Sequence, residues 1–383
     1  MSFLSDLIYF DNAATSWPKP EKVYKAAEKF LREEGANPGR SGHTMALAAE
    51  RAIEKARKLI CTFLGADNPR RVIFTLNCSD ALNIAIHGIV KRGEHVITTA
   101  LEHNSVMRPL KELELRKRIE VSLVEPGVKG YVNPADIKKE IKKNTSLIIL
   151  NHVSNVSGAV QPVEEVALIA SARGIPLLVD AAQSAGVLDI NLIEQKIPLC
   201  ALPGHKGLLG PTGTGVLYAS EKVEIDSFRQ GGSGSDSVSA RQPEEYPFHL
   251  EAGTPNTAGI AALAEGVKYV SKNIDSIRKK ERELTGFLLS ELKKIEEVKI
   301  YGPESSEERT AVISINHNSW SPDDLGAVLD ENFNIAVRTG LHCAPGVHKN
   351  LGTFPEGSLR ISCGPFNTIE ECEKLVRALR EVY

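Results

Sequence analysis

The sequence contains little cysteine, and its six cysteines lie too far apart to form a compact framework. They stand at positions 61, 78, 200, 343, 363 and 372, and no two of them make a CxxC pair. This spacing argues against a disulfide-stapled scaffold and against a structural zinc site. We therefore expect no bound metal, and a reducing, cytoplasmic setting is the default interpretation.

Long hydrophobic runs and an excess of one charge are also missing. No apolar run approaches the ~20 residues needed to cross a bilayer, and Met1–Asp6 lacks the basic start and apolar core of a signal peptide. Lys and Arg number 46 against 49 Asp and Glu, which gives a net charge of −3. We therefore expect neither nucleic acid nor a membrane as a partner, and look for a substrate pocket instead.

What the chain does contain is an alternation of short apolar runs and amphipathic stretches between about residues 70 and 220. The apolar runs are nearly continuous, as is typical of parallel strands covered on both faces. This order predicts an α/β domain, in which ligands bind outside the carboxyl ends of the strands. The predicted strands are 71–76, 95–99, 119–124, 146–151, 176–180, 198–202 and 215–219, and the predicted helices are 79–90, 108–118, one opening at Asn133-Pro134, and 162–173.

The pattern changes beyond about residue 260, where a long stretch rich in Lys and Glu predicts a helix. Shorter strands and helices follow it, which predicts a smaller α+β domain. We expect the N-terminal segment to return to this domain. The predicted helices are 260–294, 322–331 and one from Thr368, and the strands are 298–301, 310–316, 335–338 and 358–362.

Two charged residues at the ends of successive predicted strands indicate a pyridine cofactor. Asp180 ends the strand LLVD, and Lys206 follows the next strand in Gly204-His205-Lys206-Gly207. An aspartate there keeps a ring nitrogen protonated, and a lysine forms an imine with an aldehyde, provided that its amine is desolvated. Taken singly, each residue also fits a buried ion pair or a solvated loop charge.

Three further strand ends carry polar groups that suit the same ligand. Asn77-Cys78-Ser79-Asp80 opens a helix whose amides and hydroxyl can bind a phosphate, although the turn taken by itself is better explained as a plain N-cap. His103 can lie over a flat ring or be an ordinary loop histidine. Asn155 follows another strand and is expected near the ring oxygen.

Seven segments, in order along almost the whole chain, resemble the class V aminotransferase fold. More narrowly, they are similar to cysteine desulfurases of the SufS-type branch. The combined motifs are far more specific than any one of them. They are Asp11–Thr15, Glu102–Asn104, Ser154–Gly158, Val179–Gln183, Gly204–Lys206, Glu251–Asn256 and Arg338–Ala344.

The resemblance implies a fold-type I, pyridoxal 5′-phosphate (PLP)-dependent transferase. Its large domain, residues 16–258, would hold a mainly parallel seven-stranded sheet. Residues 1–15 and 259–383 would form a small α+β domain carrying the catalytic cysteine loop and the substrate-carboxylate arginine.

The resemblance also assigns cofactor contacts. Lys206 would form the Schiff base and carry protons, and Asp180 would pair with the pyridinium nitrogen. Gln183 would bond the phenolic oxygen, His103 would stack on the ring, and Asn155 would contact cofactor and substrate.

The phosphate would be held by Ser79, with Cys78 beside it, by His205, and by Thr254 from a second subunit, which predicts a homodimer. Many relatives have a serine two residues before the His-Lys pair, and this chain has Pro203 there. Phosphate binding would therefore depend more on the other groups.

The resemblance places the substrate carboxylate on Arg360, with Ala14 and Arg338 also lining the substrate site. Cys343 matches the nucleophilic cysteine. It must react as a thiolate, and Arg338 and His342 are expected to help lower its pKa.

The implied reaction removes sulfur from L-cysteine, releases L-alanine and leaves a persulfide on Cys343 for a protein acceptor. Iron–sulfur cluster assembly and thiolation of RNA or cofactors are the pathways left open. The alternatives are a selenocysteine lyase acting on L-selenocysteine, another class V lyase, aminotransferase or epimerase, and a non-catalytic sulfur-handling scaffold. A nicotinamide dehydrogenase is disfavoured because the glycine fingerprint is missing.

Overall fold

A seven-stranded sheet forms the centre of the computed structural model, which describes residues 7–39, 42–116, 118–127, 129–234 and 238–382. The strand order is β2-β8-β7-β6-β5-β3-β4. All neighbours run parallel except β8, which is antiparallel to both β2 and β7. The prediction of a mainly parallel seven-stranded sheet is confirmed. The strands are β2 (Val72–Thr75), β3 (Glu94–Thr99), β4 (Ile119–Val124), β5 (Thr145–Asn151), β6 (Leu177–Asp180), β7 (Leu199–Pro203) and β8 (Gly215–Ala219).

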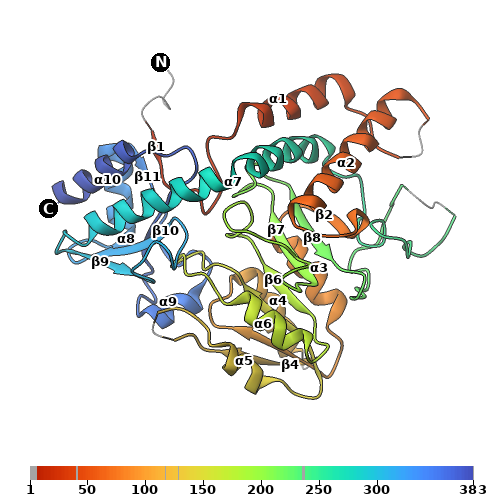
Figure 1. Ribbon diagram of the computed structural model, residues 1–383, viewed down its shortest axis with the longest axis horizontal. Helices are drawn as coiled ribbons and strands as arrows, with labels where there is room; N and C mark the ends of the chain where they lie inside the picture. The colour runs from red at the N-terminus through yellow and green to blue at the C-terminus, as the bar shows by residue number, and fades with distance from the viewer. Residues whose placement is uncertain (1–6, 40–41, 117, 128, 235–237, 383) are drawn as a thin grey trace.

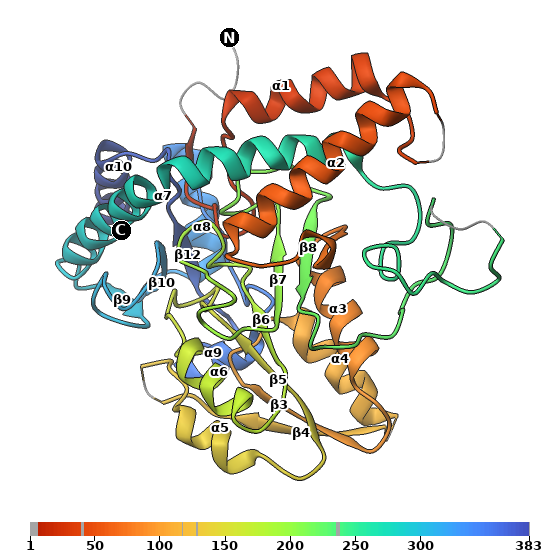
Figure 2. The ribbon, with the colours of Figure 1, turned by 45° about the vertical axis from the view of Figure 1, so that its right-hand side comes forward.

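Helices cover both faces of this sheet (Figures 1 and 2). Successive residues of β5 show why the strands are apolar throughout: Ile148 joins the core on one face, and Ile149 joins the core on the other. Burial of apolar area on two faces is the main favourable term for such a layered domain. One face packs on α3 (Cys78–Ile89) and α4 (Asn104–Leu115), and the other packs on α2 (Thr44–Phe63), α5 (Pro134–Glu140) and α6 (Val163–Ser171).

A smaller unit with its own apolar core lies beside the large sheet. Its antiparallel sheet has the order β12-β10-β9, and β1 pairs in parallel with β11 nearby. Asp11 then forms a bridge with Ser362 of β12, so the N-terminal segment does return to this unit. Its elements are β1 (Ile8–Tyr9), β9 (Val298–Tyr301), β10 (Val312–His317), α8 (Pro322–Phe333), β11 (Ile335–Ala336), β12 (Leu359–Ser362) and α10 (Ile369–Glu381). Helix α9 (Pro345–Leu351) lies between β11 and β12 in the chain, but its Val347 packs in the core of the large sheet.

Helix α7 (Thr257–Leu292) connects the two cores over 36 residues. Leu263 and Val267 pack in the core under the large sheet, and Leu284 and Leu288 pack in the smaller core. Helix α1 (Glu21–Lys29) continues into a π-helical turn, Phe30–Glu34, and packs along α7 (Figure 1). A short 3₁₀ helix, Pro69–Arg71, precedes β2. The exact domain boundaries, at residues 15/16 and 258/259, stay a prediction.

The predicted helix 108–118 begins one turn earlier, at Asn104, so that prediction was wrong at its start. The ring of His103 accepts a hydrogen bond from the Ser105 amide and thereby caps the helix, while Pro109 lies inside it. A side-chain cap of this kind satisfies an amide that the helix itself leaves unpaired. The cap holds His103 at the helix N-terminus.

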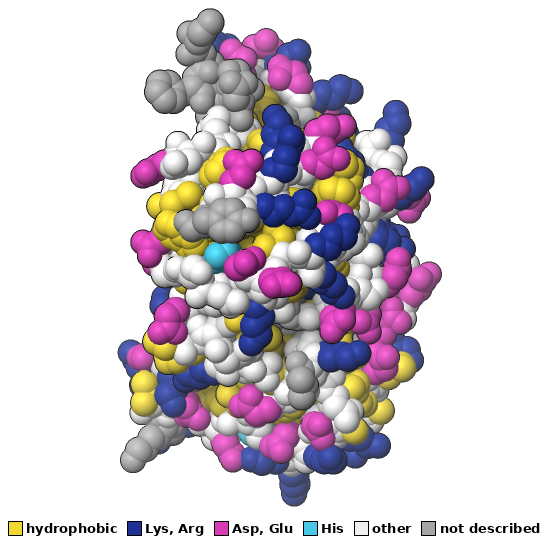
Figure 3. All heavy atoms as spheres, turned by 90° about the vertical axis from the view of Figure 1, so that its left-hand side faces the viewer, with side chains coloured by type: hydrophobic (Ala, Val, Ile, Leu, Met, Phe, Trp, Pro, Cys, Tyr) yellow, Lys and Arg dark blue, Asp and Glu magenta, His cyan; other side chains and the backbone are white. Residues whose placement is uncertain are grey.

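The face at the left of Figure 1 mixes acidic and basic side chains (Figure 3). Among the described atoms on that face, neither sign gathers into one large patch. No helix in the described part of the chain combines the length and the apolar character that spanning a membrane requires.

Candidate active site

A cavity of about 320 Å³ lies at the carboxyl ends of the central parallel strands. This volume falls within the range of small-molecule sites. The cavity brings together every predicted site residue except Thr254. Those residues are Ala14, Cys78, Ser79, His103, Asn155, Asp180, Gln183, His205, Lys206, Arg338, Cys343 and Arg360.

Lys206 and Asp180 provide the buried charge of this cavity. Burial lowers the pKa of Lys206, and the nearby Asp180 carboxylate opposes that shift. The amine is thus shifted toward the neutral form that a nucleophile or proton acceptor requires. Asp180 Oδ1 accepts hydrogen bonds from the Ala182 amide at 2.9 Å and from the Cys78 thiol at 3.5 Å. Burial raises the pKa of Cys78 well above its usual range, so Cys78 remains a thiol.

His103 and Ser79 stand on two helix N-termini that meet at the cavity. His103 Nδ1 accepts from the Ser105 amide at 3.0 Å, and Ser105 Oγ lies 2.5 Å from Ser79 Oγ. Burial lowers the pKa of His103. Because Nδ1 is an acceptor, the neutral ring carries its proton on Nε2.

His205 and Gln183 line the same cavity from the loops after β7 and β6. His205 Nδ1 is buried without a partner among the described residues, and burial lowers the pKa of the ring to about 4. Gln183 Nε2 donates to the Ala13 carbonyl at 2.9 Å. A buried amine, an unpaired ring nitrogen and the N-terminus of α3 together suit a flat, phosphate-bearing aldehyde. The residues therefore fit PLP.

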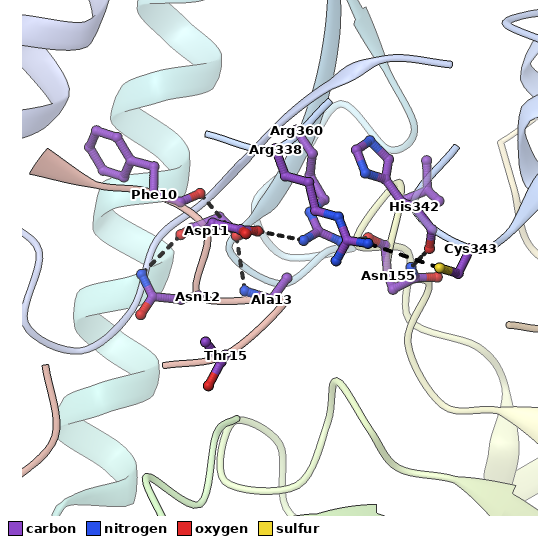
Figure 4. A network of polar contacts seen from close by, with 12 residues as sticks. Phe10, Asp11, Asn12, Ala13, Thr15, Asn155, Arg338, His342, Cys343 and Arg360 are labelled. Atoms are coloured by element: carbon purple, nitrogen blue, oxygen red, sulfur yellow. Dashed lines mark hydrogen bonds and ion pairs between the residues drawn. The ribbon is translucent and has the colours of Figure 1, made fainter. Parts of the chain in front are cut away.

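Two arginines from the smaller unit close the cavity (Figure 4). The backbones of Arg338 and Arg360 pair across an antiparallel bridge. The Arg360 side chain is 1% exposed, donates from Nη2 to Asp11 Oδ1 at 2.7 Å and donates from Nη1 to the Asn155 carbonyl at 3.0 Å. Its Nε has no partner in the described part of the chain. The arginine therefore keeps a donor free for a further anion.

Cys343 is exposed at the cavity mouth on a strained loop. His342 and Cys343 have φ values of 47° and 58°, a left-handed conformation that costs of order 1–3 kcal/mol per non-glycine residue. The Asn155 side chain donates to the His342 carbonyl at 2.7 Å, and the Asn104 amide donates to the Cys343 carbonyl at 2.8 Å. These bonds hold the loop so that the sulfur lies 3.9 Å from Arg338 Nη2.

His342 does not stand beside Cys343 as a cation, contrary to the expected role of its ring. The His342 ring is buried, Nε2 contacts the Ser358 carbonyl at 3.1 Å, and the ring packs near His348. Burial lowers the pKa of His342 to about 2. A neutral imidazole supplies no cationic charge to a thiolate. Arg338 is the cation beside the sulfur.

Thr254 lies outside this cavity, in a second one of about 490 Å³. The walls of the second cavity include Phe74, Glu251 and buried Arg57, which bonds Glu251 through two nitrogens at 2.8 and 3.0 Å. Thr254 does not reach the Lys206 cavity of its own chain. Its predicted role across a subunit boundary stays a prediction.

Three residues of the site were missed at the sequence level. Ser105 links His103 to Ser79, Asn151 lines the cavity at the end of β5, and Asp11 pairs with Arg360. Asn151 and Ser105 follow strand ends, which is a signal that could have found them. The distant Asp11–Arg360 pair had no such signal.

A sequence model of the Aminotransferase class-V family matches residues 8–375. A curated protein of Pyrococcus abyssi, described as a probable cysteine desulfurase, is 36% identical over 98% of this chain and 94% of its own length. A cysteine desulfurase of Cronobacter sakazakii is 31% identical over 98% and 93% of the two chains.

Solved structures give the same result for the fold. The apo structure of a cysteine desulfurase from Thermococcus onnurineus superposes with a TM-score of 0.93 at 35% identity, covering 98% of this chain and 94% of that one. A cysteine desulfurase from Escherichia coli, in an S-sulfonic acid form, gives 0.87 at 26% identity with the same coverage.

Proposed function

Because this chain belongs to the class V aminotransferase family, whose cysteine desulfurases use PLP, we propose that it is a cysteine desulfurase. It would remove sulfur from L-cysteine, release L-alanine and hold the sulfur as a persulfide on Cys343. The observation that carries the proposal is that Lys206, Asp180, Arg360 and Cys343 line one cavity. The relatives described as cysteine desulfurases support the same reaction.

PLP, when bound, supplies an electron sink conjugated to the substrate amine. Lys206 would hold it through its buried amine, and Asp180 would face the ring nitrogen. His205, Ser79 and the N-terminus of α3 would hold the phosphate, and His103 and Gln183 would contact the ring.

Arg360 would bind the substrate carboxylate, since a guanidinium offers paired donors to two carboxylate oxygens. Asn155 contacts both the Arg360 guanidinium and the loop of Cys343. It would therefore fix the distance between the carboxylate end and the sulfur end of the substrate. Lys206, with its pKa lowered by burial, would accept and return the proton on the α-carbon.

Cys343 would attack the substrate sulfur as a thiolate. An S–S bond forms while the Cβ–S bond of the substrate breaks. The bonding electron pair stays with the carbon skeleton, which takes up a proton at Cβ and leaves as L-alanine. The nearby Arg338 guanidinium favours the charged sulfur electrostatically. Because Cys343 is exposed, the resulting persulfide can reach an acceptor outside the cavity.

The partners follow from the same proposal. A protein would accept the sulfur, with iron–sulfur cluster assembly as one pathway, and L-selenocysteine would be a second substrate. All six cysteines are free, which suits a reducing, cytoplasmic setting. A homodimer would bring Thr254 to the neighbouring cofactor. Assignment to the SufS-type branch stays a prediction.

The test is to incubate the PLP-loaded protein with L-cysteine and a dithiol reductant, which releases the persulfide sulfur as sulfide, and to measure alanine and sulfide. Both products should form in equal amounts, and Cys343→Ala should abolish sulfur transfer. Cys363→Ala is the matched control, because Cys363 is a buried thiol and lies outside the wall of this cavity. Full transfer by Cys343→Ala would remove Cys343 from the mechanism. Absence of alanine with the unmodified protein would overturn the proposed reaction.

A further inference from the structure

Glu102 is a buried acid next to His103 of the cavity wall, and the proposed reaction does not use it. Its side chain is 1% exposed. Oε1 accepts hydrogen bonds from Thr99 Oγ1 at 2.7 Å and from the Asn151 amide at 3.1 Å. These two donors are the last residues of β3 and β5, which are neighbours in the sheet. The Glu102 carboxyl therefore ties together two strand ends from which the site is built.

The surroundings of Glu102 do not compensate a negative charge. Within the described ranges it forms no ion pair with a Lys or Arg side chain, and Oε2 has no hydrogen-bond partner. The charged group that adds to the rise in the Glu102 pKa is Asp180, whose backbone pairs with that of Asn151 across β5 and β6. Two interacting carboxylates in a buried site cannot both ionise cheaply. One of them must stay protonated.

The hydrogen-bond inventory indicates which one. Asp180 accepts two bonds and lies near the Lys206 amine, so its charge is compensated. Beside Glu102, a second acceptor, Asn151 Oδ1, is also buried without a partner. Burying two hydrogen-bond acceptors without donors destabilises the folded state. A proton on Glu102 Oε2 turns that oxygen from an acceptor into a donor.

We propose that Glu102 is held as a neutral carboxylic acid that locks the end of β3 to the end of β5, which positions His103 and Asn151 at the cavity wall and leaves Asp180 as the charged acid. Glu102 is thus a positioning residue for the proposed reaction, and this inference deepens the proposed function and rests on it. His103 follows Glu102 directly in the chain, and Asn151 lines the cavity.

Titration of Glu102 has a defined sign. Burial raises its pKa from 4.5 to about 8, against the two hydrogen bonds, and Asp180 adds to the rise. The titratable side chains next in sequence to Glu102 and Asn151 are His103 and His152, and burial lowers the pKa of both, so neither is a compensating cation. The folded protein therefore keeps a proton that the unfolded chain releases. The folded state therefore becomes less stable as the pH rises from 4.5 to about 8. The folding equilibrium constant falls by up to tenfold per pH unit in this range.

The test compares thermal unfolding of the cofactor-free protein with that of Glu102→Gln between pH 5 and 9. Glutamine keeps an acceptor for Thr99 and Asn151 and replaces the acid proton with an amide donor, without titrating. The melting temperature of the variant, relative to the unmodified protein, should increase from pH 5 to about 8 and then stay level. Glu112→Gln, an exposed change on α4, should show no such trend. A difference that does not change with pH would overturn the proposal.

PLP binding gives a second readout. At pH 6, Glu102→Gln should bind PLP within about threefold of the unmodified protein, while Glu102→Ala should bind at least tenfold more weakly because the strand-end lock is lost. Equal weakening in both variants would contradict a neutral acid. Should Glu102→Ala fail to fold, the pH series with Glu102→Gln still decides the matter. Failure of the unmodified protein to bind PLP would instead overturn the proposed function, and the pH series is independent of that result.

Discussion

Arg360 Nη2 lies 2.7 Å from Asp11 Oδ1, a contact that joins two residues 349 positions apart in the chain. Arg360 is 1% exposed and Asp11 is 21% exposed at the side chain. The arginine proposed to bind the substrate carboxylate therefore already has a counter-ion. A substrate bound there would share this guanidinium with Asp11 or displace it.

Asp11→Asn should make the protein less stable when substrate is absent and more responsive to a carboxylate ligand. Removing one partner of a buried pair leaves an uncompensated charge, and the partial exposure of Asp11 limits the loss to roughly 1–3 kcal/mol. L-alanine should then raise the melting temperature of the PLP-loaded variant more than that of the unmodified protein. Asp323→Asn, at the N-terminus of α8, is the control. Equal shifts in all three proteins would contradict competition between Asp11 and the ligand.

Arg338→Gln should slow alkylation of Cys343 by iodoacetamide at pH 7. The guanidinium lies 3.9 Å from the sulfur, and its loss removes the charge that favours the thiolate. Because the pair is partly exposed, we expect a decrease of about two- to fivefold. The distant Arg380→Gln should leave the rate unchanged. An unchanged or faster rate in Arg338→Gln would show that Arg338 does not activate the cysteine.

Mixed dimers test whether Thr254 acts across subunits. Lys206→Ala and Thr254→Val should each be inactive or severely impaired as homodimers. Co-expression should restore activity, because one site of each mixed dimer then has both Lys206 and the partner's intact threonine. Random pairing gives about one quarter of full activity, since about half of the dimers are mixed and each has one intact site. Activity that stays at the level of the single variants would contradict the assignment.

The cofactor-free protein should be most stable near pH 6.5. On the acid side, burial lowers the pKa of several histidines from 6.5, so the unfolded chain binds protons that the folded chain does not, and stability falls as the pH drops below 6.5. The histidines with the largest lowering are His152, His205 and His348, each to about 4, and His342, to about 2.

On the alkaline side, burial raises the pKa of Glu102 and of Glu281 from 4.5 to about 8. Between pH 6.5 and 8 these acids keep protons that the unfolded chain has lost, so stability falls as the pH rises. Calorimetry from pH 4.5 to 8 should show the maximum. Glu281→Gln should flatten the alkaline side, steepen the acid side and move the maximum to higher pH, because the folded protein keeps the Glu281 proton from pH 4.5 to about 8. A melting temperature that rises steadily to pH 8 would contradict this balance.

The sequence predicted the sheet well because its strands carry a strong signal. Runs such as 147–150 (LIIL) are apolar without interruption, as expected of a strand buried on both faces, and each predicted strand of the large sheet lies within two residues of an observed one. Strand direction was harder to predict. A buried strand has the same hydrophobic pattern whether it runs parallel or antiparallel to its neighbours. The sequence therefore did not indicate that β8 runs antiparallel to β2 and β7.

The site was predictable where a residue follows a strand, as Asp180 and Lys206 do. Side-chain orientation was less predictable. His342 and Cys343 are neighbours in the sequence, yet the His342 ring is buried and the Cys343 sulfur is exposed. Both residues have a left-handed backbone, which the sequence did not indicate. The burial of Glu102 was not predicted, because the sequence does not show which acidic side chains are buried without a neighbouring cation.

Helix α7 limits how far the smaller unit can move relative to the large sheet. It is continuous from Thr257 to Leu292, contains no proline and is anchored in both cores. A continuous helix of this kind resists sharp bending. A large swing of the smaller unit against the large sheet would break its backbone hydrogen bonds, so we expect the walls of the cavity to keep their spacing. Under the proposed function, entry of the substrate and exit of the sulfur would then depend on the loop of Cys343.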